Sequence, residues 1–190
     1  MVKKITISMA QLNPVVGDIS GNTNKLLSEY DQISEYSDLL IVSELYVSGY
    51  PPEDLVMRKP FQDSVRQEIL RICNATKSRK SWIAVGTPWI VNKELYNAVL
   101  VIGEGKIQDV CLKHILPNYS VFDEVRVFSN GPLPVPVTIK GIDFGILICE
   151  DAWSPETVNN LSNLGIDILI VINGSPFGED KIVERQKQMS

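Results

Sequence analysis

The sequence predicts a single domain of the mixed α/β class, with helices packed on a sheet that contains both parallel and antiparallel strands. Apolar segments of strand length alternate along the chain with segments whose apolar residues recur at helical spacing. Short turns containing glycine also join neighbouring strand segments into hairpins, so the sheet is not purely parallel. No repeat, low-complexity tract or linker divides the 190 residues.

The first half of the chain contains segments with the two-residue periodicity of strands and segments with the spacing of helices. Apolar residues at every second position, Ile5, Ile7 and Met9, indicate the first strand. Leu26, Leu27, Tyr30 and Ile33 lie on one face of the first helix. The expected elements are a strand at Val2–Leu12, a helix at Asn22–Tyr36, a strand at Asp38–Leu45, a loop at Ser48–Leu55, a helix at Phe61–Thr76 and a strand at Ser81–Ile90.

The second half is predicted from its turn and cap signals. Gly103-Glu104-Gly105 and Lys140-Gly141 each mark a hairpin turn. Ser154-Pro155-Glu156 is typical of a helix start, and Gly165 of its end. The expected elements are strands at Leu95–Ile102, Lys106–Lys113, Ile142–Cys149 and Ile166–Asn173, an irregular stretch at Asn118–Pro136, and a polar helix at Gly178–Ser190.

Composition narrows the classes of function. The net charge of −5 argues against nucleic-acid binding, which usually needs a basic surface. His114 is the single histidine, so the sequence has no multi-histidine metal site. The three cysteines are widely spaced, which fits neither a disulfide framework nor a zinc site and is typical of a reducing compartment. Without an apolar run of membrane-spanning length or a signal peptide, we expect a cytoplasmic protein with no membrane partner.

Cys149 is the first candidate for chemistry, because it ends an apolar strand directly before two acids and a helix start. A strand-to-helix corner projects a side chain outward and leaves the next backbone N–H groups free to donate to an oxyanion. The alternative is a buried structural cysteine, which is common in strands. Cys73 and Cys111, on a helix face and within a strand, are expected to be structural.

Glu44 and Lys113 also lie near strand ends that precede loops. Taken alone, Glu44 could cap the loop backbone and Lys113 could be a solvated surface residue. Together with Cys149 they indicate a site for acyl transfer. The carboxylate can take the thiol proton, and the ammonium can stabilise the charge that develops on the attacked carbonyl oxygen.

The order Glu44, Lys113, Cys149 resembles the catalytic triad of the nitrilase superfamily. Four blocks are similar to the glutaminase domain of glutamine-dependent NAD⁺ synthetases, in the correct order from the first strand to the last. They are SELYVSGYPPEDL (Ser43–Leu55), LKHILPNYSVFDEVRVF (Leu112–Phe128), ILICEDAW (Ile146–Trp153) and INGSPF (Ile172–Phe177).

The resemblance implies an αββα sandwich in which Cys149 attacks the side-chain amide of L-glutamine. Glu44 would be the general base, and Lys113 with the backbone N–H after Cys149 would hold the oxyanion. The ammonia would pass to a synthetase domain of the same polypeptide, which uses ATP and Mg²⁺ to convert deamido-NAD⁺ to NAD⁺. No cofactor is expected within residues 1–190 themselves. Members of the family usually form oligomers, so a homo-oligomer is expected.

The resemblance also implies a set of glutamine-pocket residues. Glu124 would orient Lys113, with a surface ion pair to Arg126 as the alternative. Tyr119 would contact glutamine and Tyr50 would line the entrance, with ordinary loop packing as the alternative for both. The remaining residues of this set are Ser175, Lys181 and Glu150.

Two departures from the family pattern leave other functions open. A nitrilase-type domain is longer than this chain, so we expect the sandwich to be incomplete at its C-terminus. The sequence also contains no SGGxDS-type pyrophosphate loop of a synthetase domain. A free-standing amidase of the same superfamily and a non-catalytic assembly module are therefore the alternatives to the glutaminase.

Overall fold

Two β-sheets form the centre of the molecule. In the computed structural model, which describes residues 4–119, 121–175 and 186, the larger sheet has the strand order β1-β2-β3-β4-β5 and the smaller one β6-β7-β8. Strand β3 pairs with β2 in parallel and with β4 antiparallel, so the larger sheet is mixed as predicted. The strands are β1 (Ile7–Met9), β2 (Leu39–Ile41), β3 (Trp82–Val91), β4 (Glu94–Gly103), β5 (Lys106–Leu112), β6 (Val137–Ile139), β7 (Ile142–Ile148) and β8 (Ile168–Ile172).

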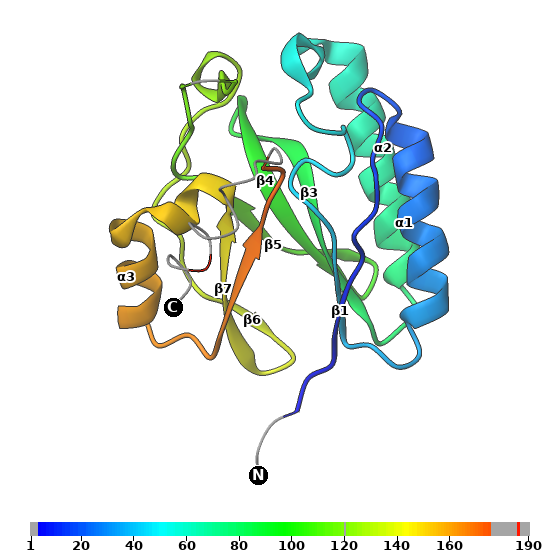
Figure 1. Cartoon of the computed structure of the whole chain (residues 1–190). Coiled ribbons are helices and arrows are strands. Elements are labelled where there is room, and N and C mark those ends of the chain that lie inside the picture. Colours follow the sequence, from blue (N-terminus) through cyan, green and yellow to red (C-terminus); the bar gives the residue numbers. More distant parts are fainter. Residues whose placement is uncertain (1–3, 120, 176–185, 187–190) are drawn as a thin grey trace.

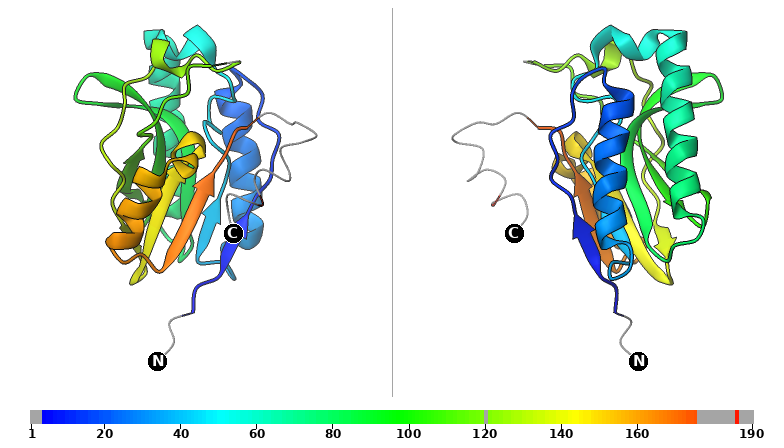
Figure 2. Two further views of the ribbon diagram at one scale, coloured as in Figure 1. Left: turned by 60° about the vertical axis from the view of Figure 1, so that its left-hand side comes forward. Right: turned by 90° about the vertical axis from the view of Figure 1, so that its right-hand side faces the viewer.

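Helices cover the outer face of each sheet. Figures 1 and 2 show α1 (Ile19–Ile33) and α2 (Lys59–Thr76) side by side on the larger sheet, and α3 (Pro155–Asn163) on the smaller one. Three short 3₁₀ helices, η1 (Glu53–Met57), η2 (Glu124–Arg126) and η3 (Cys149–Trp153), lie in the connections. The layers therefore run helix, sheet, sheet, helix, which confirms the expected αββα sandwich.

Separate apolar cores hold these layers together. Between the sheets, Val99 and Val101 of β4 belong to the same buried cluster as Phe144 and Ile146 of β7. Leu26 of α1 packs with the outer face of the larger sheet, in a second cluster. The alternation of inward and outward side chains along the strands supplies both faces of each sheet.

Several local predictions are confirmed. Glu104-Gly105 and Lys140-Gly141 adopt positive φ, as the predicted hairpin turns require. Asn92-Lys93 also has positive φ and forms a third such turn, which was not predicted. Ser154 caps α3, since its hydroxyl oxygen accepts a hydrogen bond from the Glu156 N–H at 3.2 Å. Gly165, with φ of 78°, follows the C-cap of the same helix.

The boundaries predicted for the first two strands are wrong. β1 and β2 have three residues each, not the eleven of Val2–Leu12 and the eight of Asp38–Leu45. After β2 the chain turns, and the Val47 N–H donates to the carbonyl oxygen of Gly86 at 3.1 Å. Apolar composition alone does not distinguish such a buried turn from a strand. Of the expected helix at Gly178–Ser190, only Gln186 lies within the described residues.

Candidate active site

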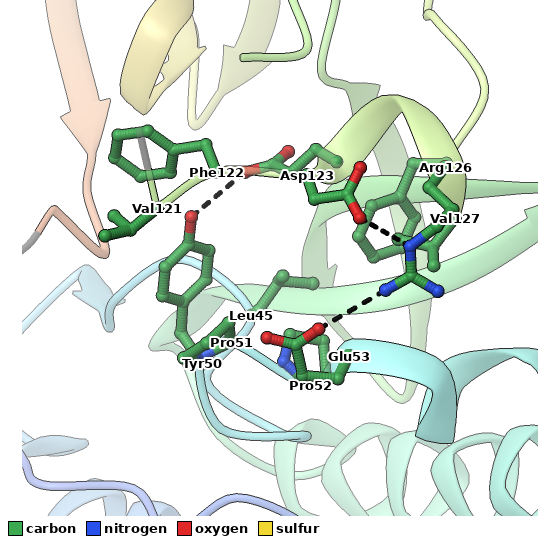
Figure 3. Close-up of a pocket in the computed structure, with 12 residues that line it drawn as sticks. Leu45, Tyr50, Pro51, Pro52, Glu53, Val121, Phe122, Asp123, Arg126 and Val127 are labelled. Atoms are coloured by element: carbon green, nitrogen blue, oxygen red, sulfur yellow. Dashed lines mark hydrogen bonds and ion pairs between the residues drawn. The ribbon is translucent and has the colours of Figure 1, made fainter. Parts of the chain in front are cut away.

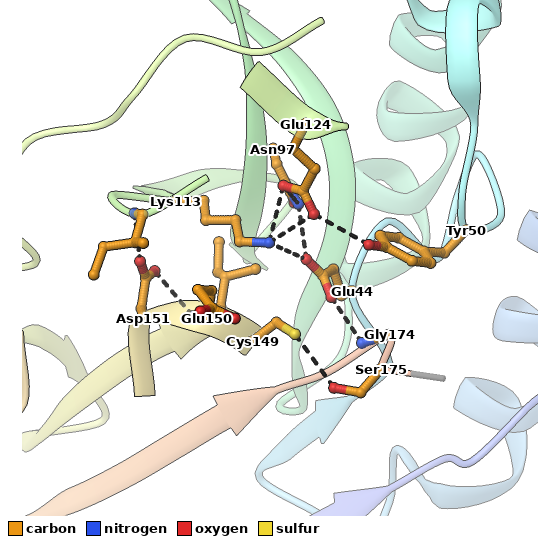
Figure 4. Close-up of polar contacts among 12 residues, drawn as sticks. Glu44, Tyr50, Asn97, Lys113, Glu124, Cys149, Glu150, Asp151, Gly174 and Ser175 are labelled. Carbon is orange, nitrogen blue, oxygen red and sulfur yellow. Dashed lines mark hydrogen bonds and ion pairs between the residues drawn. The ribbon is translucent and has the colours of Figure 1, made fainter. Parts of the chain in front are cut away.

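Cys149 occupies the corner between β7 and η3. Its φ is 50°, a left-handed conformation that L-residues other than Gly and Asn seldom adopt. The side chain is almost fully buried, and its Sγ atom lies 3.3 Å from the hydroxyl oxygen of Ser175, which follows β8. In Figure 4 the thiol points toward the space shared by Glu44 and Ser175. The strained corner thus aims the thiol at groups from other elements.

Glu44 lies in the tight turn after β2, beneath Gly86 of β3. A Cβ atom on Gly86 would lie 2.4 Å from the carbonyl oxygen of Ser43 and 2.8 Å from the Cα atom of Glu44, so only glycine permits this close approach. The Glu44 carboxylate is buried. Its Oε2 atom accepts a hydrogen bond from the Gly174 N–H at 2.7 Å.

Lys113, directly after β5, joins two buried carboxylates. Its Nζ atom lies 2.8 Å from Glu44 Oε1 and 2.8 Å from Glu124 Oε1 (Figure 4). Burial alone would lower the pKa of Lys113, but the two carboxylates outweigh burial and raise it above its usual value. Lys113 is therefore a fixed cation in this site, and the alternative of a solvated surface lysine is wrong.

Glu124 belongs to η2 and faces the same cluster. Its alternative assignment, a surface pair with Arg126, is wrong, because Arg126 pairs instead with Asp123, Asp54 and Glu53. Figure 3 shows Arg126 paired with Asp123 and Glu53 at a pocket that Tyr50 also lines. The Tyr50 hydroxyl donates to Glu124 Oε1 at 3.2 Å. Burial, with the carboxylates of Glu44 and Glu124, raises the pKa of Tyr50, so its hydroxyl remains a donor.

The Cys149 thiol is protonated in this arrangement. Burial, followed by the negative charge of Glu44, raises its pKa to about 11. The Ser175 hydroxyl, the Lys113 ammonium and the Gly174 N–H act in the opposite direction. A thiol with this pKa needs a base to become a nucleophile, and the adjacent carboxylate of Glu44 can serve as one.

Asp151 is a buried member of the site that the sequence analysis did not single out. Its Oδ1 atom accepts hydrogen bonds from the N–H groups of His114 and Ile115, and its Oδ2 atom from that of Ile148. It therefore ties the segment after Lys113 to the corner that carries Cys149. Burial raises the pKa of Asp151 to about 6. Its position two residues after Cys149 was the feature of the sequence from which a role in the site could have been predicted.

Asn97 of β4 was also missed. Its Nδ2 atom lies 2.9 Å from Glu44 Oε1 and 3.3 Å from Glu124 Oε2, and the side chain is fully buried (Figure 4). It occupies one position of a regular strand, and nothing in the local sequence distinguishes it from a residue of ordinary strand structure.

The remaining pocket candidates have different positions. Tyr119 is more than half exposed, and its hydroxyl donates to Glu150 Oε2 at 2.9 Å. Its ring also makes an edge contact with Phe122, so loop packing contributes to its placement. Ser175 contacts the Cys149 thiol. Lys181 lies outside the described residues.

Two further findings concern metals and membranes. Among the residues that the structure describes, no group of three His, Cys, Asp or Glu side chains is placed to hold a metal ion. No helix in the same part of the chain has the length and apolar character needed to cross a bilayer.

The site offers a thiol, a carboxylate and an ammonium, which together suit attack on a carbonyl carbon.

Comparison with known proteins assigns the family. The family model for carbon–nitrogen hydrolases matches residues 6–190. The chain belongs to the carbon–nitrogen hydrolase family. This hydrolase chain is 38% identical over 178 residues to a glutamine-dependent NAD(+) synthetase of Aquifex aeolicus. The match covers 93% of the chain and 31% of the relative. It is 36% identical to the enzyme of the same name from Thermotoga maritima, covering 100% of the chain and 33% of the relative.

Solved structures support the fold of this hydrolase chain. A glutamine-dependent NAD⁺ synthetase from Acinetobacter baumannii, in complex with ADP, superposes with a TM-score of 0.91 at 34% identity. The match covers 97% of this chain and 35% of that one. An amidase from Nesterenkonia sp. superposes with a TM-score of 0.80 at 19% identity, covering 95% and 70% respectively, and shows the shared fold. The chain spans about a third of the length of the synthetases it matches.

Proposed function

We propose that this chain is the glutaminase part of a glutamine-dependent NAD⁺ synthetase. The buried group of Glu44, Lys113 and Cys149 carries the proposal, because it places a base and a cation beside a thiol that needs both. The choice of glutamine as substrate follows from the names of the synthetase relatives, which match nearly the whole chain.

In the proposed reaction, Glu44 takes the thiol proton while Cys149 Sγ attacks the side-chain carbonyl carbon of glutamine. Lys113 and the N–H after Cys149 stabilise the oxyanion. The carbon–nitrogen bond then breaks, and Glu44 returns the proton to the departing ammonia. A γ-glutamyl thioester remains on Cys149. Water, deprotonated by Glu44, attacks this thioester, releases glutamate and regenerates the thiol.

The other pocket residues have supporting roles in the same proposal. Glu124 orients Lys113 through the ion pair between them. Tyr50 lines the entrance, and Tyr119 with Glu150 holds the polar end of glutamine. Ser175 contacts the thiol. Lys181 neutralises the substrate carboxylate.

The ammonia has a destination outside this chain. We assign it to a synthetase domain of the same polypeptide, where ATP and Mg²⁺ activate deamido-NAD⁺ for amidation. We also place the reaction in the cytoplasm, where the free thiol of Cys149 stays reduced, and in a homo-oligomer. Size-exclusion chromatography with light scattering measures the assembly directly.

The decisive experiment separates the two half-reactions in the full protein. Cys149→Ala should abolish release of glutamate from glutamine while leaving synthesis from free ammonia intact. Cys73→Ala is the matched control, because Cys73 lies on the buried face of α2 and should not affect turnover. Glutamate release by Cys149→Ala at the wild-type rate would contradict the assigned nucleophile. Hydrolysis of simple amides without any hydrolysis of glutamine would contradict the assigned substrate.

A further inference from the structure

Asn97 contacts both carboxylates of the cluster around Lys113 and the backbone of Lys113 itself. Its Nδ2 atom donates to Glu44 Oε1 at 2.9 Å and approaches Glu124 Oε2 at 3.3 Å. Its backbone carbonyl oxygen accepts a hydrogen bond from the Lys113 N–H at 2.9 Å. One residue in the middle of β4 thus contacts both carboxylates and the segment that carries the ammonium.

The amide of Asn97 is only half satisfied. Within the part of the chain that the structure describes, its Oδ1 atom is buried and has no hydrogen-bond partner. Turning the amide over would not help, because Oδ1 would then face the two carboxylate acceptors. A buried polar atom without a partner lowers stability, so the presence of an asparagine at this position points to a function of its N–H₂ group.

The hydrogen bonds to Glu44 distinguish its two oxygen atoms. Oε1 accepts from Lys113 Nζ and from Asn97 Nδ2, whereas Oε2 accepts from the Gly174 N–H. Gly174 directly precedes Ser175, whose hydroxyl contacts the Cys149 thiol. The Oε2 atom therefore lies on the side of the thiol and has the greater capacity to accept a proton (Figure 4).

We infer that Asn97 is a positioning residue for the base of this site. Its N–H₂ group, together with Lys113, occupies Glu44 Oε1, so that Oε2 faces Cys149 and takes its proton. The same N–H₂ group stabilises the ionised carboxylates without adding a charge. A second lysine at this position would instead neutralise the base. This inference deepens the proposed glutaminase reaction and rests on it for the substrate used in the first test.

The first test is the pH dependence of glutamine hydrolysis by Asn97→Ala in the full protein. Loss of a hydrogen bond to a charged group should lower kcat/KM by about tenfold to 100-fold, mainly through kcat. A hydrogen-bond donor stabilises the ionised form of the carboxylate that accepts from it, so its removal disfavours that form. The acid limb of kcat/KM should therefore move to higher pH. Asn97→Ser, which keeps one donor, should recover part of both effects.

Asn22→Ala is the matched control. Asn22 is also a fully buried asparagine, but its side chain bonds to the backbone of Val15 and Val47. Its replacement should lower thermal stability without moving the acid limb. An Asn97→Ala variant that loses stability but keeps the wild-type acid limb would overturn the inference, since that is the result expected of a purely structural residue.

Alkylation of Cys149 by iodoacetamide tests the same inference without glutamine. Asn97→Ala should move the acid limb of the alkylation rate to higher pH, and it should cause no further shift in a Glu44→Gln background. If the wild-type protein does not hydrolyse glutamine but Asn97→Ala still shifts the alkylation profile, the proposed function fails and the role of Asn97 stands. If glutamine is hydrolysed and neither profile moves, the role of Asn97 fails alone.

Discussion

The Nζ atom of Lys113 lies 2.8 Å from the Oε1 atom of Glu44, and both side chains are almost fully buried. The two residues follow strands that are not neighbours in the larger sheet, Glu44 after β2 and Lys113 after β5. Because a buried charge without a partner is very unfavourable, this ion pair fixes the position of each strand end relative to the other. The site is thus held by electrostatics as well as by packing.

We expect Lys113→Met to destabilise the fold strongly. It would leave the carboxylates of Glu44 and Glu124 buried without a counter-ion, at a cost of about 3–5 kcal/mol in the free energy of unfolding. Lys59→Met, which breaks the exposed ion pair with Asp63, should change it by less than about 1 kcal/mol. Urea denaturation measures both. Equal effects of the two substitutions would contradict a buried charge cluster.

Ser175→Ala should slow the alkylation of Cys149. The Ser175 hydroxyl lowers the pKa of the thiol, so its removal should raise that pKa further above the value of about 11. Loss of a hydrogen bond to the thiolate should reduce the rate by about tenfold below the thiol pKa. Ser81→Ala, a buried serine outside the site, is the control. Identical alkylation rates for wild type and Ser175→Ala would exclude this contact as a determinant of reactivity.

Asp151 should make stability fall as the pH rises from about 4 to about 6. Its pKa is raised by burial from 3.8 in the unfolded chain to about 6 in the fold, so the folded state binds the proton more tightly in that window. The contribution of Asp151 to the free energy of unfolding is present below the unfolded pKa of 3.8 and is lost above the folded pKa of about 6. Asp151→Asn lacks this titration, so the unfolding free energy of the variant minus that of wild type should rise by about 2 kcal/mol between pH 4 and pH 6.

The measurement is urea denaturation of both proteins at a series of pH values. The difference between the two curves isolates Asp151, because Glu124, whose pKa is also raised by burial, is present in both. A difference that stays constant from pH 4 to pH 6 would show that Asp151 does not titrate in this range.

Gly86→Ala should impair both stability and turnover. The added methyl group would overlap the backbone of Ser43 and Leu45, and the turn that carries Glu44 would have to move. We expect a loss of about 1–3 kcal/mol in stability together with a fall in kcat. Gly145→Ala crowds side-chain methyl groups of Leu161 and Ile166 instead, so it should affect stability and leave kcat unchanged. Thermal unfolding and glutamate release measure the two effects. Wild-type kcat in Gly86→Ala would contradict the role of this contact.

The sequence was sufficient for the fold class and for the position of the Cys149 corner. Turn and cap residues such as Lys140-Gly141 and Ser154-Pro155 act locally, so their consequences can be predicted without tertiary contacts. The ends of β1 and β2 could not be predicted in the same way. The chain leaves β2 because the turn at Glu44 packs beneath Gly86, a contact between residues about forty positions apart.

The polar contacts of the site were only partly predictable. Cys149, Glu44 and Lys113 lie at the ends of apolar segments. A reactive or charged side chain directly after an apolar strand can be recognised from the sequence. Asn97 lies within a strand, where a polar residue ordinarily faces solvent, and its burial becomes evident only when β5 and the turn after β2 are in place.

The left-handed backbone at Cys149 sets the local folding preference against the proposed role of its thiol. Glycine or asparagine would adopt a φ of 50° more readily than cysteine does. A library randomised at this position and screened only for resistance to heat should therefore become enriched in these two residues, while one screened for turnover should return cysteine. The cysteine side chain thus stands on a backbone conformation that disfavours it, as expected if the proposed reaction requires a thiol at this corner.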